Sequence, residues 1–190
     1  MQAFIGNLSK IPSMSLRLYL AAFSLARPFG GTPMTDYTLL ASQLQSLTED
    51  ERCFMPNLAN ASALIYQSLP DLNWAGFYLT EFPADPTTTP VLVLGPFQGK
   101  TACIRIPYGR GVCGTAAKTD SVQRIDDVHQ FPGHIACDSA SNSEIVIPIH
   151  SNGHVVGVLD IDSPVFSRFS PEDEQGLLAL VQILETNCDF

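Results

Sequence analysis

The sequence predicts an α+β fold in which helices flank a central antiparallel β-sheet, within one domain that has no internal repeat. Two amphipathic helices come first, several short strands follow, and another helix closes the chain. A four-residue turn joins the last two strands, and such a short connection makes neighbouring strands antiparallel. Because the outer helices are kept apart from a run of strands, the pattern is typical of α+β proteins.

Apolar spacing and start signals predict the three long helices. Leu40, Leu44 and Leu47 recur at i, i+4 and i+7, which predicts a helix over residues 36–47. A second helix is predicted over residues 54–69. The last helix opens at Ser170, followed by a proline and acidic residues. The expected buried stripes of these two helices are Leu58, Ala61, Leu64 and Ile65, and then Leu177, Leu178, Val181 and Leu184.

Short segments of alternating or continuous apolar character predict the strands. These segments are WAGFYLTE (74–81), VLVLGPF (91–97), ACIRIPY (102–108), VQRIDDV (122–128), EIVIPIH (144–150) and VVGVLDID (155–162). The stretch GRGVCGTAAKT (109–119) is a glycine-rich turn that enters a short helix. Residues 129–142 are predicted to form a long polar loop, and SNGH (151–154) is the turn of the final hairpin.

Composition and charge narrow the class of protein. The 190 residues are 45% hydrophobic, which is typical of a globular domain. The formal net charge of −9 and only ten scattered Lys and Arg residues argue against a nucleic-acid-binding protein. The five cysteines are odd in number, and their closest spacing is C-x9-C, so neither a disulfide scaffold nor a structural zinc site is predicted. Two interpretations of the cysteines remain: they are buried structural thiols, or they carry out redox chemistry in a reducing compartment.

The first 33 residues differ from the rest because they contain Lys10, Arg17 and Arg27 and no acidic residue. Their apolar stretch, 16–26, is too short to cross a bilayer and is interrupted by an arginine. A weak targeting segment is one interpretation. The favoured interpretation is an extension, disordered or outside the domain, with the domain itself over residues 34–190. No membrane-spanning segment is predicted.

Two acidic and two aromatic residues are the first candidates for a site. Asp160 and Asp162 alternate on one strand and therefore share a face, opposite Leu159 and Ile161. That face is either an ordinary solvent face or a site for a ligand ammonium, and too few ligand-type residues stand nearby to favour a metal. Trp74 and Tyr78 share a face of another strand, in the core or as walls of a small pocket.

The cysteines divide by context. Cys113 opens a helix, where the N-terminal partial charge stabilises a thiolate, although a small packing residue is the alternative. Cys103 alternates with Arg105, and therefore lies on the polar side of its predicted strand. Cys53 and Cys188 stand among apolar neighbours and are interpreted as structural. The histidines show no spacing typical of a Cys–His pair and are interpreted as surface residues: His129, His134, His150 and His154.

The remaining cysteine, Cys137, lies in GHIACDSASNSEIVIPI (133–149), where small residues leave the backbone accessible just before Glu144. Together with NWAGFYL, GRGVCGTAA and GVLDIDSPVFSRFSPED, this stretch closely resembles one family, the free methionine-(R)-sulfoxide reductases, which are stand-alone members of the GAF domain superfamily. The resemblance covers residues 34–185 and implies a GAF-like fold. The loop EFPADPTTTP (81–90) looks long for the family.

The resemblance assigns roles to the cysteines. It implies that Cys137 is the attacking residue, that Cys103 is its usual disulfide partner, and that Cys113 is a third redox cysteine. The helix-terminus argument by itself nominates Cys113 as the nucleophile. The resemblance is followed, because a loop beside an accessible backbone suits attack on a bound ligand.

The implied reaction is the reduction of free L-methionine (R)-S-oxide, without a cofactor or metal. Glu144, Asp160 and Asp162 would crowd one another, so that one stays protonated and donates to the sulfoxide oxygen while the others hold the substrate ammonium. Trp74 and Tyr78 would wall the methylthio end, and backbone N–H groups of residues 137–143 would bind the α-carboxylate. The resulting sulfenic acid would become a disulfide that thioredoxin reduces.

This interpretation also predicts a cytoplasmic enzyme of the response to oxidative stress that rejects peptide-bound methionine sulfoxide and binds neither nucleic acid nor membrane. A homodimer is compatible with the superfamily. The alternative function is a GAF-type sensor of a small molecule or of redox state, but no effector domain fits in this chain. A thiol enzyme that acts on another sulfur or selenium oxide is a third hypothesis.

Overall fold

The computed structural model describes residues 35–85, 87–133 and 138–190. The expected N-terminal extension (1–33) and Cys137 therefore lie outside the described residues. Among the described helices, none combines the length and the apolar character needed to cross a bilayer.

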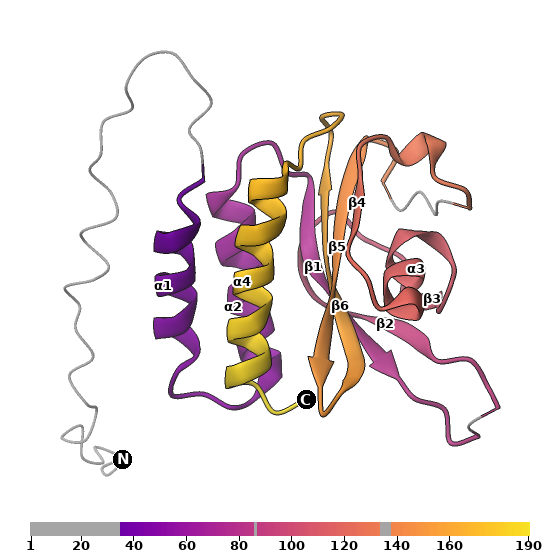
Figure 1. Ribbon diagram of the computed structural model, residues 1–190, viewed down its shortest axis with the longest axis horizontal. Coiled ribbons are helices and arrows are strands. Elements are labelled where there is room, and N and C mark those ends of the chain that lie inside the picture. The colour runs from indigo at the N-terminus through magenta and orange to yellow at the C-terminus, as the bar shows by residue number, and fades with distance from the viewer. Residues whose placement is uncertain (1–34, 86, 134–137) are drawn as a thin grey trace, which may run out of the picture. The chain divides into compact units, whose positions relative to one another are not determined.

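An antiparallel sheet forms the centre of the fold (Figure 1). Its strands are β1 (Trp74–Glu81), β2 (Val91–Gly99), β3 (Arg105–Pro107), β4 (Gln123–Ile125), β5 (Ser143–Ser151) and β6 (His154–Ser163). They lie side by side in the order β3-β2-β1-β6-β5-β4, and every neighbouring pair is antiparallel. The predicted fold class is confirmed.

Helices cover both faces of this sheet, as Figure 1 shows. They are α1 (Tyr37–Thr48), α2 (Phe54–Ser68), α3 (Gly111–Thr119) and α4 (Pro171–Asn187). The helices α2 and α4 pack on one face, and α1 packs against these two helices on the side away from the sheet. Leu159 and Ile161 of β6 join the apolar stripes of the three helices in the larger core. The helix α3 packs on the other face over Tyr78 and Val158, which belong to a smaller apolar cluster. Strand alternation therefore sends the two neighbours of Leu159, Val158 and Asp160, toward α3.

Local signals explain the ends of the C-terminal elements. The side chain of Ser170 accepts a hydrogen bond from the Asp173 N–H (3.2 Å), and the Asp173 carboxylate accepts one from the Ser170 N–H (2.8 Å), which is a capping box. Between β5 and β6, Asn152 and Gly153 take φ values of 51° and 77°, as a tight hairpin turn requires. Both predictions for this region, the hairpin and the helix start, are confirmed.

The first helix is confirmed, but only two leucines of its apolar repeat are buried. Leu47 is 49% exposed, whereas Leu40, Leu44 and Thr48 are buried. A buried threonine is tolerated because its hydroxyl donates to the Leu44 carbonyl (2.9 Å) and accepts from the Asn187 amide (2.8 Å). The helix therefore buries positions i, i+4 and i+8.

The strand predicted over residues 102–108 is also shorter than expected, because only Arg105–Pro107 pairs with β2. Before it, Ile104 is 70% exposed and does not share a buried face with Ile106. The Tyr78 hydroxyl donates to the Cys103 carbonyl (2.9 Å), which turns this segment over the face that carries α3. Alternation therefore does not apply to Cys103, and its predicted pairing with Arg105 on one strand face is wrong.

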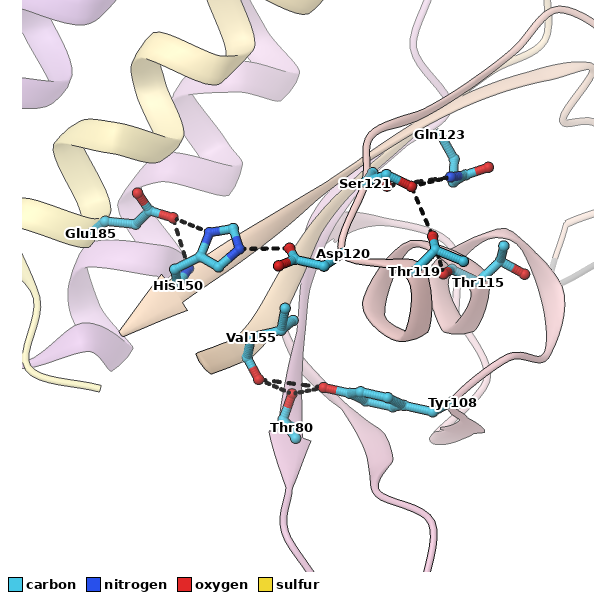
Figure 2. Close-up of polar contacts among 10 residues, drawn as sticks. All are labelled: Thr80, Tyr108, Thr115, Thr119, Asp120, Ser121, Gln123, His150, Val155 and Glu185. Atoms are coloured by element: carbon cyan, nitrogen blue, oxygen red, sulfur yellow. Dashed lines mark hydrogen bonds and ion pairs between the residues drawn. The ribbon is translucent and has the colours of Figure 1, made fainter. Parts of the chain in front are cut away.

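His150 is not a simple surface residue, because it bridges two helices across the edge of β5 (Figure 2). Its Nδ1 and its backbone N–H both meet Glu185 of α4, at 3.0 and 2.7 Å, and its Nε2 meets Asp120 at 2.7 Å. Asp120 ends α3 in a left-handed conformation, with φ 49°. This part of β5 is open because β4 pairs only as far as Val146.

The His150 bridge predicts a pH-dependent part of the stability. Burial alone would lower the pKa of His150, but the hydrogen bonds that its ring donates to the Asp120 and Glu185 carboxylates outweigh burial and raise the pKa above 6.5. Because the folded pKa exceeds the unfolded one, this stabilisation is complete below the unfolded pKa and is lost as pH rises through the folded value. Urea unfolding of the wild type and His150→Gln between about pH 6 and pH 9 should show a free-energy difference that shrinks with rising pH. Parallel pH profiles would contradict this.

Candidate functional site

The three central strands bring the predicted acidic and aromatic residues to the same face of the sheet. Asp162 of β6 lies opposite Glu144 of β5 on one side and opposite Trp74 of β1 on the other. Two residues along β6, Asp160 lies opposite Gly76. Because paired residues of antiparallel strands point to the same side, all these side chains face α3.

A cavity lies between this face and α3. It is lined by Trp74, Tyr78, Thr101, Ala102, Ile106, Arg110, Gly111, Val112, Cys113, Asp138, Ser141, Glu144, Asp160 and Asp162. Cys113, in the first turn of α3, places its Sγ 3.8 Å from Oε1 of Glu144. The potential ligand atoms of Cys113, Glu144 and Asp160 all lie within 4.8 Å of one another. The cavity thus has an acidic, thiol-bearing floor beneath aromatic and polar walls.

Burial favours the protonated form of the carboxyl groups of Glu144, Asp160 and Asp162, which together make up the acidic floor of the cavity. Glu144 is 5% exposed and Asp160 is 6% exposed. Burial, and then the charge of Asp160, raise the pKa of Glu144 and of Asp162 well above the ordinary values. Burial also raises the pKa of Asp160 to about 6. At neutral pH the group therefore keeps at least one carboxylic acid that can donate a hydrogen bond, because like charges this close cannot all ionise.

The thiol of Cys113 is neutral rather than activated. Burial raises its pKa well above 9.0, and the neighbouring charges of Asp160 and Glu144 raise it further. The partial positive charge at the start of α3 does not compensate for three nearby carboxyl groups. The expected stabilisation of a Cys113 thiolate is therefore wrong.

The aromatic wall is a stack of three rings held by one hydrogen bond. Trp74 stacks on Phe97, with ring centroids 5.3 Å apart, and on Tyr78 at 6.0 Å. Its indole N–H donates to the Lys100 carbonyl (3.1 Å). Gly76 lies beneath this stack, where a Cβ atom would clash with Phe97 and come within 2.7 Å of the Trp74 ring.

The predicted cysteines occupy different environments. Cys103 is half-buried and directly follows Ala102 of the cavity wall. Cys188 is buried and accepts a hydrogen bond from the Asn57 amide (3.5 Å), which fits the structural interpretation. Cys53 is exposed, so its interpretation as a structural residue among apolar neighbours is wrong.

Sequence reasoning missed a polar cluster beside the cavity, centred on Asp138. Its carboxylate meets the Lys100 ammonium (3.0 Å), the Asn73 amide (3.3 Å) and the Ala140 N–H (3.0 Å). The Ala140 hydrogen bond and then the Lys100 contact lower the pKa of Asp138, so it is ionised at neutral pH. The only sequence signal was an acidic residue directly after a cysteine, because its partners come from distant segments.

The N–H groups expected to hold a substrate carboxylate are partly used inside their own loop. Those of Ala140 and Ser141 donate to Asp138, and that of Asn142 donates to the Ser163 carbonyl (2.8 Å). For these three residues the expectation is wrong. Arg110 is another candidate, because it lines the cavity directly before the first turn of α3 and forms no ion pair with a described residue.

Comparisons with known proteins agree with this geometry. The GAF domain model matches residues 37–187. The chain is 60% identical over 149 residues to the free methionine-R-sulfoxide reductase of Escherichia coli, covering 78% of this chain and 86% of that protein. It is 46% identical over 151 residues to the Saccharomyces cerevisiae protein of the same name, with coverage of 77% and 82%.

A solved structure of a substrate complex is similar as well. The free methionine-R-sulfoxide reductase of Neisseria meningitidis, in complex with its substrate, superposes with a TM-score of 0.76. Its sequence identity is 40%, and the match covers 85% of this chain and 94% of that one.

Proposed function

The chain belongs to the GAF domain family and, within it, to the free methionine-R-sulfoxide reductases, and from this premise we propose that its cavity reduces the R epimer of free methionine sulfoxide to methionine. The observation that carries the proposal is the group of buried carboxyl groups around the cavity. The matched region also supports the assignment of residues 34–190 as the domain and 1–33 as an extension.

The acidic floor supplies the activation that the reaction needs. A sulfoxide sulfur becomes electrophilic once its oxygen accepts a proton or a strong hydrogen bond, and a buried carboxylic acid among Glu144, Asp160 and Asp162 supplies it. The remaining ionised carboxylate attracts the substrate ammonium. Trp74 and Tyr78 then enclose the methylthio end.

The thiol steps follow the family pattern. Cys137 attacks the activated sulfur, and the oxygen passes to the cysteine as methionine is released, which leaves a sulfenic acid. The thiol of Cys103 displaces water from this acid and forms a disulfide. A dithiol of the thioredoxin class then takes up the oxidising equivalents by exchange. A neutral Cys113 fits an auxiliary role better than the role of first nucleophile.

A site that recognises a free amino acid needs one binding partner for the substrate carboxylate and another for its ammonium group. The substrate carboxylate would meet Arg110 and the first N–H groups of α3, which have no partner within the helix. A peptide bond removes the ammonium charge that the acidic floor attracts. Thiol recycling also places the protein in a reducing compartment, and we propose the cytoplasm. A homodimer remains a prediction.

The proposal is tested by turnover with thioredoxin, thioredoxin reductase and NADPH. We expect turnover of the free R epimer, and kcat/KM at least about a hundredfold lower for the S epimer. The N-acetyl R epimer should lose about 10- to 100-fold, the value of one charge-assisted contact. Binding of the R epimer without turnover would favour the sensor alternative.

A further inference from the structure

Cys113, Glu144 and Asp160 come from three separate elements, α3, β5 and β6, and converge on one point. One ligand atom from each lies within 4.8 Å of the other two, and all three residues are buried. A tetrahedral zinc ion holds sulfur at about 2.3 Å and oxygen at about 2.1 Å, so its ligands stand about 3–4 Å apart. The distance of 3.8 Å between Cys113 Sγ and Glu144 Oε1 lies in that range.

A second observation points to a cation as the ligand of this cluster. The Oδ1 atom of Asp160 is buried and has no hydrogen-bond partner among the described residues. The whole residue is only 6% exposed, so water does not hydrate this oxygen freely. A buried carboxylate oxygen without a partner is costly, and a bound cation is one of the few groups that compensate for it.

The donor set selects the kind of cation. A thiolate beside two carboxylates disfavours calcium and magnesium, which prefer oxygen ligands, and suits zinc. Three protein ligands leave the fourth position open to water. Binding converts the Cys113 thiol to a thiolate and releases its proton, together with any proton held by the two carboxyl groups.

We propose that Cys113, Glu144 and Asp160 of the reduced protein form a zinc site that reversibly blocks the cavity. The metal occupies the carboxyl groups that the proposed function assigns to the substrate, so zinc and methionine sulfoxide exclude each other. The thiol must be reduced, since a disulfide sulfur does not bind the ion. Zinc thus acts as an inhibitor of this site, whereas the reaction itself proceeds without it.

The first experiment measures binding without activity. The full chain, reduced with a phosphine and stripped with a chelator, is titrated with Zn²⁺ against a chromophoric chelator, and we expect one ion per chain. Cys113→Ser and Asp160→Asn should each weaken binding at least tenfold. Cys53→Ser is the matched control, because it removes an exposed cysteine outside the cavity and should not change binding. Equal affinity in Cys113→Ser and the wild type would overturn the site.

A second measurement identifies the ligand. Co²⁺ should give a thiolate-to-cobalt charge-transfer band that Cys113→Ser abolishes and Cys137→Ser retains. Loss of the band in Cys137→Ser alone would assign the metal to another thiol and overturn the proposal. Zinc affinity should also fall as free methionine is added. Turnover measured with excess chelator separates the two proposals: turnover without zinc binding refutes only the zinc site, and zinc binding without turnover refutes only the reductase.

Discussion

Replacing Cys137 with serine is expected to abolish the reduction of free methionine (R)-sulfoxide, with a loss of at least about a thousandfold in kcat. A serine hydroxyl does not ionise near neutral pH and is a weak nucleophile toward sulfur, so neither the sulfenic acid nor the disulfide forms. The measurement is methionine released per protein chain in a single turnover, without reductant. Mass spectrometry should find no sulfenic acid in the variant.

Cys103→Ser is the matched variant, because it removes the proposed disulfide partner and keeps the proposed nucleophile. It should release about one methionine per chain and then stall or slow, since the sulfenic acid has lost its usual partner. Any turnover that continues after the first would show that Cys113 can replace Cys103 as the disulfide partner. Equal loss of the first turnover in both variants would contradict the assignment of roles.

Asp160→Asn is expected to weaken catalysis and stabilise the fold at the same time. Loss of a charge-assisted contact to the substrate ammonium should raise KM about 10- to 100-fold. The same change removes a buried carboxylate whose pKa is raised to about 6 by burial. At neutral pH, where the wild-type group loses its proton, we expect a gain in unfolding free energy of about 1–3 kcal/mol.

The direction of the expected change in unfolding free energy follows from how the wild-type stability depends on pH. The folded pKa of Asp160, about 6, lies above the ordinary value of 3.8 for an aspartate in the unfolded chain. The folded state therefore holds its proton more tightly, and the wild type loses stability as pH rises through about 6. The advantage of Asp160→Asn should shrink as pH falls from about 6 and should be absent below about pH 4.

Asp138→Asn is the control, because at neutral pH it should change the stability of the fold in the opposite direction to Asp160→Asn. The Ala140 hydrogen bond and then the Lys100 contact lower the pKa of Asp138, so its ionised form stabilises the fold. That stabilisation is present above the unfolded pKa and is lost as pH falls through the folded one. Asp138→Asn should lower Tm at neutral pH, whereas Asp160→Asn raises it. A shift of both variants in the same direction, or an unchanged KM in Asp160→Asn and Asp162→Asn, would contradict the account of the acidic floor.

Apolar repeats of period 2 for strands and 3.6 for helices were sufficient to predict most of the secondary-structure elements. The final hairpin and the last helix were predictable because their turn and cap signals are local in the chain. Prediction failed where a distant partner overrides the pattern. Thr48 takes the buried place of Leu47 because Asn187 satisfies its hydroxyl, and the segment before Arg105 leaves the sheet because Tyr78 holds the Cys103 carbonyl.

The residues of the site also divide into those that the sequence predicted and those that depend on distant partners. Alternation placed Asp160 with Asp162, and Trp74 with Tyr78, because residues two or four apart on a strand share a face. It could not reveal that Cys113 would lie among those acids, 31 positions before Glu144 in the chain. The partners of Asp138 and the bridge through His150 were hidden for the same reason, since Lys100, Asn73 and Glu185 come from other elements.

The sequence by itself determined the fold class, the family and the residue types available for thiol chemistry, because short-range periodicity and contiguous motifs carry that information. Only the tertiary structure decided the protonation of the site. The N-terminus of a helix would favour a thiolate at Cys113, but burial of the thiol, and then the charges of the carboxyl groups on β5 and β6, raise its pKa and reverse that preference. Burial and charge are sums over neighbours in space, and no linear motif records them.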